Sequence, residues 1–391
     1  MKEFLFSAAE KYSLAFLQLL ATLFMTNYFG MESLGMVASF TLITALATVV
    51  AEAGSSLVIM GAKQPEVQNR IHESFVITLV LGVTFYVVIF LCADYYSDKI
   101  VSTVDFGNTL RCYGLLAISA PLQIVGFSSL IKLEETKALT SINFLAWLCA
   151  FGVLLLIHVL QLGDYRSVIW YFLVLSCTRA FLSWLRLYRA LGLRILGIRF
   201  QEVRFRLSLI SSQLCNTVAA NIWTMLVAVH VSLEANAVLG LFNKLKDMGS
   251  GNLSHALHRV LYVRLANADG RRSAVTKVFS WFFFGNSILC LAIYCLKPII
   301  LEVFGGEYRS DLDPFILFPL ILGLIFPAFD FMKAILRYFN QTLVLGVEVL
   351  LFLGIGALFV VEVHPVDAFC TYLILSTVAG IIFTLNVFAR A

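Results

Sequence analysis

A stripe of polar and titratable residues runs through the apolar segment LFNKLKDMGSGNLSHALHRVLYVR. Its members recur every three or four positions, so they share one face of a predicted helix. They are Lys244, Asp247, Gly251, His255, His258, Arg259 and Tyr262. A charged side chain at the centre of a membrane-spanning helix costs about 2.5–3.5 kcal/mol, so such residues usually face a water-filled cavity. The stripe therefore predicts a cavity of mixed to basic character.

Polar side chains also occur inside other predicted helices. Glu52, within VVAEAGSSLV, is an acid deep in the second predicted span, next to Gly54 and two serines. Arg111 and Arg179 are basic residues of the fourth and sixth spans, and Asp330 begins a polar triplet in the tenth. The predicted substrate-cavity residues are Glu52, Arg111, Asn216, Asn221, Lys244, Asp247, His255, His258, Arg259, Asp330 and Lys333.

Several of these side chains also have a structural interpretation. Arg259 lies near the inner end of its predicted helix and can extend to lipid phosphates. Lys244 and Asp247 can form an ion pair at i, i+3. A glutamate at the depth of Glu52 is protonated, paired with a cation or exposed to water in a cleft. The sequence leaves these alternatives open.

No catalytic constellation is present in the sequence. It contains no G-x-S-x-G, no H-E-x-x-H, no P-loop and no metal-ligand spacing. The eight cysteines are scattered singly, without a C-x-x-C pair, as is typical of small apolar core residues. We therefore predict a protein that is not an enzyme and uses no catalytic residue, metal or cofactor.

The composition predicts the elements that position these residues. With 391 residues, 60% of them hydrophobic, and a mean hydropathy of +0.90, the chain has the composition of an all-α polytopic membrane protein. The net charge of +4 belongs to loops and does not indicate nucleic-acid binding. We expect about twelve transmembrane helices, at residues 8–28, 34–60, 74–93, 109–131, 141–161, 167–186, 208–230, 236–263, 278–297, 312–336, 342–361 and 366–388.

Basic residues alternate between successive loops. The densest group lies in LRLYRALGLRILGIRFQEVRFR, between Leu185 and Arg206, where apolar residues at helical spacing also favour a helix on the membrane surface. Every second loop is basic, and the loops between them are poorer in Lys and Arg and contain acids. Because basic loops remain in the cytoplasm, we expect both termini and the central linker to be cytoplasmic.

The two sides of this linker resemble each other. Residues 28–43 align without a gap with 230–245, and 119–136 align with 325–342, which superposes Pro121 on Pro327. Each half has an even number of predicted spans, so the repeat is parallel, about an axis along the membrane normal. We predict a six-helix bundle at 1–186, a basic linker at 187–207 and a second six-helix bundle at 208–391, around a central cleft.

The segment AEAGSSLVIMGAKQPE, followed by a basic inner loop and a third span, carries a family resemblance. It resembles the E-x-G-x-x-x-x-L-I-x-x-K pattern of Wzx-type O-antigen or exopolysaccharide flippases, within the multidrug/oligosaccharidyl-lipid/polysaccharide exporter superfamily. The positions of this family pattern that can be assigned in the present sequence are Glu52, Gly54, Leu57 and Lys63. The resemblance implies a carrier of polyprenyl-diphosphate-linked oligosaccharide in a bacterial inner membrane, with polysaccharide polymerase and chain-length machinery as partners.

Two other functions remain open. A cation-coupled multidrug exporter of the same superfamily would share the architecture, although we would expect it to have a more acidic and aromatic cavity. A membrane polysaccharide polymerase or ligase would act on the same lipid-linked sugar. The short outer loops and the internal repeat disfavour this enzyme.

Overall fold

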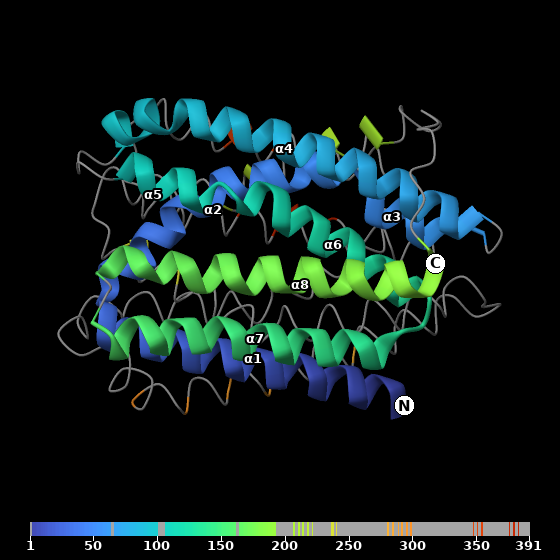
Figure 1. The fold of residues 1–391 in the computed structure, drawn as a ribbon, viewed down its shortest axis with the longest axis horizontal. Helices are drawn as coiled ribbons and strands as arrows, with labels where there is room; N and C mark the ends of the chain where they lie inside the picture. Colours follow the sequence, from blue (N-terminus) through green and yellow to red (C-terminus); the bar gives the residue numbers. More distant parts are fainter. Residues whose placement is uncertain are drawn as a thin grey trace. The chain divides into compact units, whose positions relative to one another are not determined.

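The computed structural model describes residues 2–63, 66–100, 106–161 and 164–192, and scattered residues between 206 and 382. Every regular element in this described part is helical, as the all-α prediction requires. Among the residues that the structure describes, five segments are long and apolar enough to cross a membrane (Figure 1). They are Ser33–Gly61, Val67–Ser97, Phe106–Lys132, Lys137–Val159 and Val168–Leu191.

The helices coincide with the first six predicted spans, but two of the spans are interrupted. The second span consists of two helices, as does the fourth. The bounds are α1 Lys2–Phe29, α2 Met31–Glu52, α3 Ser55–Gly61, α4 Val67–Ile100, α5 Phe106–Tyr113, α6 Leu116–Lys132, α7 Thr136–Val159, a short 3-10 helix Tyr165–Ser167 and α8 Val168–Leu191. The multi-pass membrane character predicted from composition is confirmed over this part of the chain.

The chain divides into two compact units that do not follow the sequence halves. One unit is Asn27–Leu233, and the other combines Met1–Thr26 with Glu234–Ala391. The unit Asn27–Leu233 contains α2 to α8 and is described below. The predicted domain boundaries at 186 and 208 mark the sequence repeat and stay a prediction.

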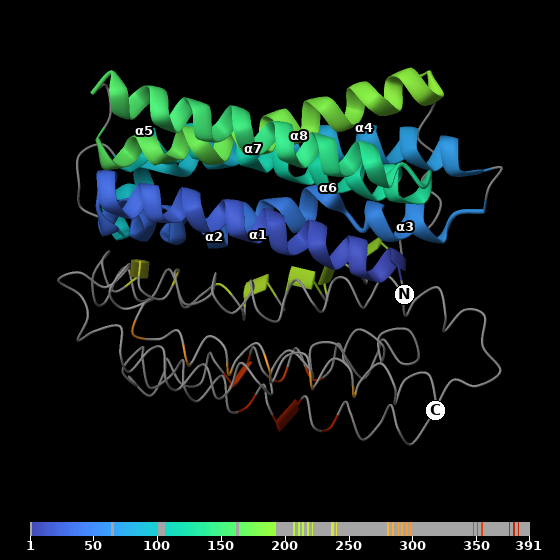
Figure 2. The ribbon, with the colours of Figure 1, turned by 90° about the horizontal axis from the view of Figure 1, so that it is seen from below.

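Within this unit, α6 is the central helix. It contacts α2, α3, α4, α7 and α8, and Figure 2 shows it between α8 on one side and α2 and α3 on the other. Small residues let its neighbours approach closely: a Cβ placed on Gly126 would meet the side chain of Ser183 in α8. Close helix contact through small residues is the usual packing of membrane helices.

The C-terminal ends of α3, α6 and α8, each of which precedes or lies in a predicted basic connection, are at the same end of the unit. We call it the α3 end (on the right in Figure 1). Gln68 at the start of α4 donates a hydrogen bond to the carbonyl of Leu191 at the end of α8 (2.8 Å). Lys132 at the end of α6 donates to the carbonyl of Met60 in α3 (2.9 Å). The grouping agrees with the predicted alternation of basic loops. That this end faces the cytoplasm stays a prediction.

Candidate functional site

The second span is broken where a glutamate precedes a glycine and two serines. Ala53 has a φ of 50° and Gly54 a φ of 67°, both in the left-handed region. Two successive left-handed residues stop the i to i−4 hydrogen-bond pattern, and so α2 ends at Glu52 and α3 begins at Ser55. Glycine adopts this conformation readily, whereas alanine pays a steric cost. A strained break inside a span requires stabilising contacts around it.

The side chain of Glu52 supplies the first of these contacts. Its two oxygens accept hydrogen bonds from the backbone N–H groups of Gly54 (3.1 Å) and Ser56 (2.6 Å). These donors lie at the start of α3, where intrahelical acceptors are missing. The side chain is 4% exposed. The acid predicted to lie deep in the second span is therefore buried, and it caps the short helix that follows it.

Arg206 stabilises the same break through the backbone carbonyl of Ala53. Its Nη1 atom donates hydrogen bonds to this carbonyl (3.1 Å) and to the hydroxyl of Ser55 (3.0 Å). Arg206 is 7% exposed, although it belongs to the arginine-rich segment predicted to be a basic cytoplasmic linker. A buried guanidinium is tolerated only when it is paired and hydrogen-bonded.

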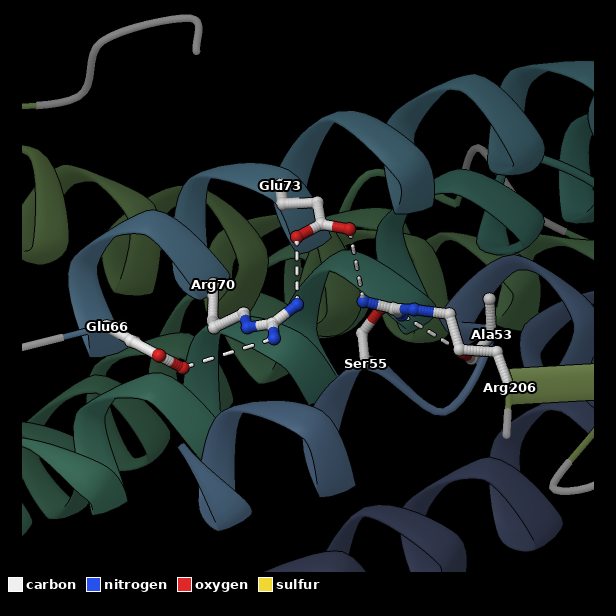
Figure 3. A network of polar contacts seen from close by, with 6 residues as sticks. All are labelled: Ala53, Ser55, Glu66, Arg70, Glu73 and Arg206. Carbon is white, nitrogen blue, oxygen red and sulfur yellow. Dashed lines mark hydrogen bonds and ion pairs between the residues drawn. The ribbon is translucent and has the colours of Figure 1, made fainter. Parts of the chain in front are cut away.

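Glu73 in α4 provides the charge that pairs with Arg206. Figure 3 shows its carboxylate between two arginines, with one oxygen toward each. One oxygen lies 3.9 Å from Nη2 of Arg206, and the other accepts a hydrogen bond from Nη1 of Arg70 (3.4 Å). Arg70 also lies 4.0 Å from the carboxylate of Glu66. Charges of alternating sign thus extend from the start of α4 to the break in the second span.

Further polar groups lie on α4 beside this ion-pair chain. His72, Ser74 and Thr78 are almost completely buried. The hydroxyls of Ser74 and Thr78, one helical turn apart, have no hydrogen-bond partner among the residues that the structure describes. The cap at Glu52 and the ion-pair chain form the candidate functional site, which we call the break cluster: Glu52, Ala53, Ser55, Arg70, Glu73 and Arg206.

The structure places Arg111 away from the break cluster. Arg111 is at the end of α5, where it donates hydrogen bonds to the carboxylate of Asp94 and the side chain of Asn108. Its guanidinium also lies 5.2 Å from the ring centroid of Phe90. Glu52 and Arg111, both predicted to line the cavity, are thus engaged in contacts at different places in the unit.

Of the remaining predicted cavity residues, the structure describes only Asn221. Asn221 donates a hydrogen bond to the carbonyl of Thr217, one turn earlier (2.9 Å). All the others lie outside the described residues, and their role stays a prediction. They are Asn216, Lys244, Asp247, His255, His258, Arg259, Asp330 and Lys333.

Glu52 is the only member of the break cluster among the predicted site residues, and the sequence analysis also missed the buried ion pair of Glu73 and Arg206. Glu73 falls one position before the predicted third span at 74–93, and Arg206 was assigned to the linker. A glutamate and an arginine at the very edges of apolar runs are the only sequence signals for them. Arg179, a weaker candidate, buries its Nε atom in the middle of α8 with no hydrogen-bond partner among the described residues.

Comparison with known proteins gives one family and one fold. Residues 25–310 match the family described as "Polysaccharide biosynthesis protein". No curated protein matches the sequence.

Solved structures match almost the whole chain. An inward-facing multidrug resistance MATE family transporter of the MOP superfamily is 19% identical, with a TM-score of 0.67 over 98% of each chain. An outward-facing structure described in the same terms is 18% identical, with a TM-score of 0.64 over 100% of this chain and 95% of the other. The MATE multidrug transporter DinF-BH is 14% identical, with a TM-score of 0.67 over 99% and 96%. These matches confirm the predicted fold class, an all-helical polytopic membrane protein of the two-bundle type.

Proposed function

The chain belongs to the family of polysaccharide biosynthesis proteins, and from that membership we propose that it is a flippase for lipid-linked sugars. In this role it moves polyprenyl-diphosphate-linked oligosaccharide repeat units from the cytoplasmic to the outer leaflet of a bacterial plasma membrane. The units would then serve O-antigen or exopolysaccharide synthesis. The family match from 25 to 310 carries the proposal, because it covers α2 to α8 and the predicted polar stripe.

The chemistry of such a substrate agrees with a protein of this composition. A polyprenyl tail gains about 0.8 kcal/mol per buried CH₂ group, so it remains in the lipid throughout. Only the sugar and the diphosphate require a hydrated path. An inside-negative potential favours outward movement of the anion by about 2.3 kcal/mol per charge per 100 mV.

Basic residues within the spans would bind the diphosphate. Lys244, Arg259 and Lys333 are predicted to face the cavity, where their charges would offset the desolvation of the anion. Arg179 adds a candidate from the described part of the chain, because its Nε donor is buried in a span without a partner there. A donor in this position suits an anionic ligand better than a cationic drug.

The second candidate function is a cation-coupled multidrug exporter. The matched solved structures favour it, because several of them are described as multidrug transporters. At 14–19% identity these matches support a shared fold, and the family match favours polysaccharide synthesis. A polymerase or ligase is disfavoured because the predicted outer connections between described helices are short, such as 101–105 and 160–164.

Reconstitution into proteoliposomes tests the proposal. A polyprenyl-diphosphate oligosaccharide with a fluorescent sugar is incorporated into both leaflets, and a membrane-impermeant reagent that quenches the fluorophore is added outside. A flippase brings the protected label to the outer surface, so quenching becomes complete at a rate that depends on the protein. A parallel assay follows the uptake of a fluorescent organic cation. Cation transport without glycolipid movement would establish the multidrug exporter instead.

A further inference from the structure

Arg179 lies on the face of α8 opposite to the exposed apolar residues of that helix. Trp170 and Tyr188 are 49% and 56% exposed, and they lie nine positions before and nine positions after Arg179. Nine positions are two and a half turns of a helix with 3.6 residues per turn. In a span, an exposed apolar face contacts lipid, whereas ionisable residues face the interior. Arg179 therefore points into the unit, where α8 packs against α6 and α7 (Figure 1).

No carboxylate pairs with Arg179 in the part of the chain that the structure describes. Its Nε atom is buried there without a hydrogen-bond partner. The one titratable group of this part whose charge interacts with Arg179 is Tyr171, about two turns earlier on α8. The hydroxyls of Ser119 and Ser176, the latter one turn before Arg179, hydrogen-bond to each other (3.0 Å). The neighbours of Arg179 are thus neutral, and its charge is not compensated.

The depth of Arg179 excludes a contact with lipid phosphates. Arg179 follows Val168, the first residue of α8, by 11 positions and precedes Leu191, the last residue, by 12. At 1.5 Å per residue, the guanidinium starts about 17 Å from either end of the helix. Arginine side chains extend to the membrane surface from positions near helix ends. A cation at this depth without a counter-charge is strongly unfavourable, so its presence calls for an anionic ligand.

We propose that Arg179 is a binding residue for a phosphate-bearing anion, and that this anion is the diphosphate of the lipid-linked substrate, which rests on the proposed function. Arg179 is partly exposed, so a ligand can reach its guanidinium. A guanidinium binds phosphate oxygens through two parallel N–H donors, and the missing counter-charge is supplied by the ligand. The phosphate of an ordinary anionic lipid has the same chemistry, but it remains at the membrane surface. A diphosphate that crosses the membrane passes the middle of α8.

Binding of a short diphosphate lipid tests the proposal without transport. The purified full chain is titrated with geranyl diphosphate in an uncharged detergent, by isothermal titration calorimetry. We expect Arg179→Gln to bind this probe about 10- to 100-fold more weakly than the parent, because a hydrogen bond to a charged group is lost. The matched control is Arg186→Gln on the same helix, since Arg186 is 48% exposed and pairs with Glu135 (2.8 Å); its affinity should be unchanged.

The same titration distinguishes the two sources of phosphate. A short-chain phosphatidylglycerol should bind much more weakly than geranyl diphosphate, and its affinity should not depend on Arg179. If both probes bind the parent equally, the ligand is a lipid headgroup and the proposal is wrong. Absence of diphosphate binding in the parent, or an unchanged affinity in Arg179→Gln, would also overturn it.

Thermal unfolding separates a ligand-binding arginine from a structural one. Arg179→Met replaces the guanidinium by an apolar side chain. Without ligand, we expect this variant to unfold at the same temperature as the parent or higher, because an uncompensated buried charge is removed. Geranyl diphosphate should raise the melting temperature of the parent and leave that of the variant unaltered. A lower melting temperature of the ligand-free variant would mean that Arg179 stabilises the fold, which contradicts the proposal.

The inference and the proposed function can fail separately. Diphosphate binding through Arg179 in a protein that does not move the fluorescent glycolipid would count against the flippase alone. Glycolipid movement at the parent rate by Arg179→Gln, together with an unchanged affinity for geranyl diphosphate, would overturn the role of Arg179 and leave the flippase standing.

Discussion

Gly82 of α4 lies directly against the backbone of Ala117 in α6. A Cβ atom placed on Gly82 would be 2.9 Å from the carbonyl oxygen of Ala117 and 3.1 Å from the Cα of Ile118. Pro121, four residues after Ala117, has no N–H to donate to that carbonyl. The proline and the glycine thus act together, because one frees a carbonyl and the other lets a neighbouring helix approach it.

We expect Gly82→Ala to destabilise the protein, because the added methyl group meets backbone atoms that cannot rotate away. Overpacking of this kind costs about 1–3 kcal/mol, against a gain of about 0.5–1 kcal/mol from replacing glycine by alanine in a helix. Thermal unfolding in detergent measures the net effect. Gly152→Ala in α7 is the matched control, because nothing lies within 4 Å of its added Cβ; it should be neutral or stabilising. Equal melting temperatures for the two variants would contradict the packing argument.

The cap at Glu52 predicts a graded response to substitution. Glu52→Ala leaves the buried N–H group of Gly54 and the partly buried N–H group of Ser56 without their acceptors, and an unsatisfied buried donor costs about 1–3 kcal/mol. Glu52→Gln keeps one acceptor oxygen and should lose less. Melting temperatures should therefore fall in the order parent, Gln variant, Ala variant. If the Ala variant were as stable as the parent, the two hydrogen bonds would contribute nothing to the break.

The spans could be predicted from sequence because they depend on local composition. A window of apolar residues long enough to cross a bilayer must form a helix, since its backbone has no other hydrogen-bond partner there. The break at Ala53 and Gly54 is a different kind of feature. Mean hydropathy is unaffected by two residues in a left-handed conformation, so 34–60 was predicted as a single span, although the flanking Glu52 was recognised as unusual.

The ion pairs of the break cluster could not be predicted for a related reason. Glu73 and Arg206 each lie beside an apolar run, where a charge usually marks the end of a span. Their pairing depends on how distant helices pack, and no periodicity in the sequence encodes it. The burial of Arg206 shows that an arginine counted as part of a basic loop can belong to the interior of the unit.

Cysteine accessibility tests the orientation of the chain. Leu196→Cys, in the arginine-rich segment, should react with a membrane-impermeant thiol reagent only after the cells are permeabilised, because basic loops remain in the cytoplasm. The eight native cysteines must first be replaced. Labelling of this site from outside intact cells would reverse the predicted topology.

The predicted cavity charges should be required for transport and not for folding. Lys244→Ala and Arg259→Ala remove donors from the predicted polar stripe, so the diphosphate would lose a charge-assisted hydrogen bond worth about 1.5–3 kcal/mol, or roughly 10- to 100-fold in rate. Arg179→Gln should act similarly if its buried Nε faces the substrate. Glycolipid transport is compared at equal membrane expression, with Arg186→Ala as the control for a lost surface charge. Native rates for Lys244→Ala and Arg259→Ala would mean that these side chains extend to lipid phosphates or pair locally.

The last prediction concerns energy coupling, for which Glu52 and His255 are the candidate proton carriers. Protonation of Glu52 would convert one acceptor oxygen into a donor that faces a backbone N–H, so proton binding would loosen the start of α3. Transport is measured in proteoliposomes with an imposed pH gradient at zero membrane potential. If Glu52 couples proton movement to transport, the pH gradient should change the transport rate of the parent protein. The transport rate of Glu52→Gln should be the same with and without the gradient. Outward movement of the anion down the membrane potential needs no proton. The control is therefore a second transport measurement, with a membrane potential imposed and no pH gradient. A parent rate that ignores a gradient of either sign would reject coupling and leave Glu52 as the residue that caps the broken helix.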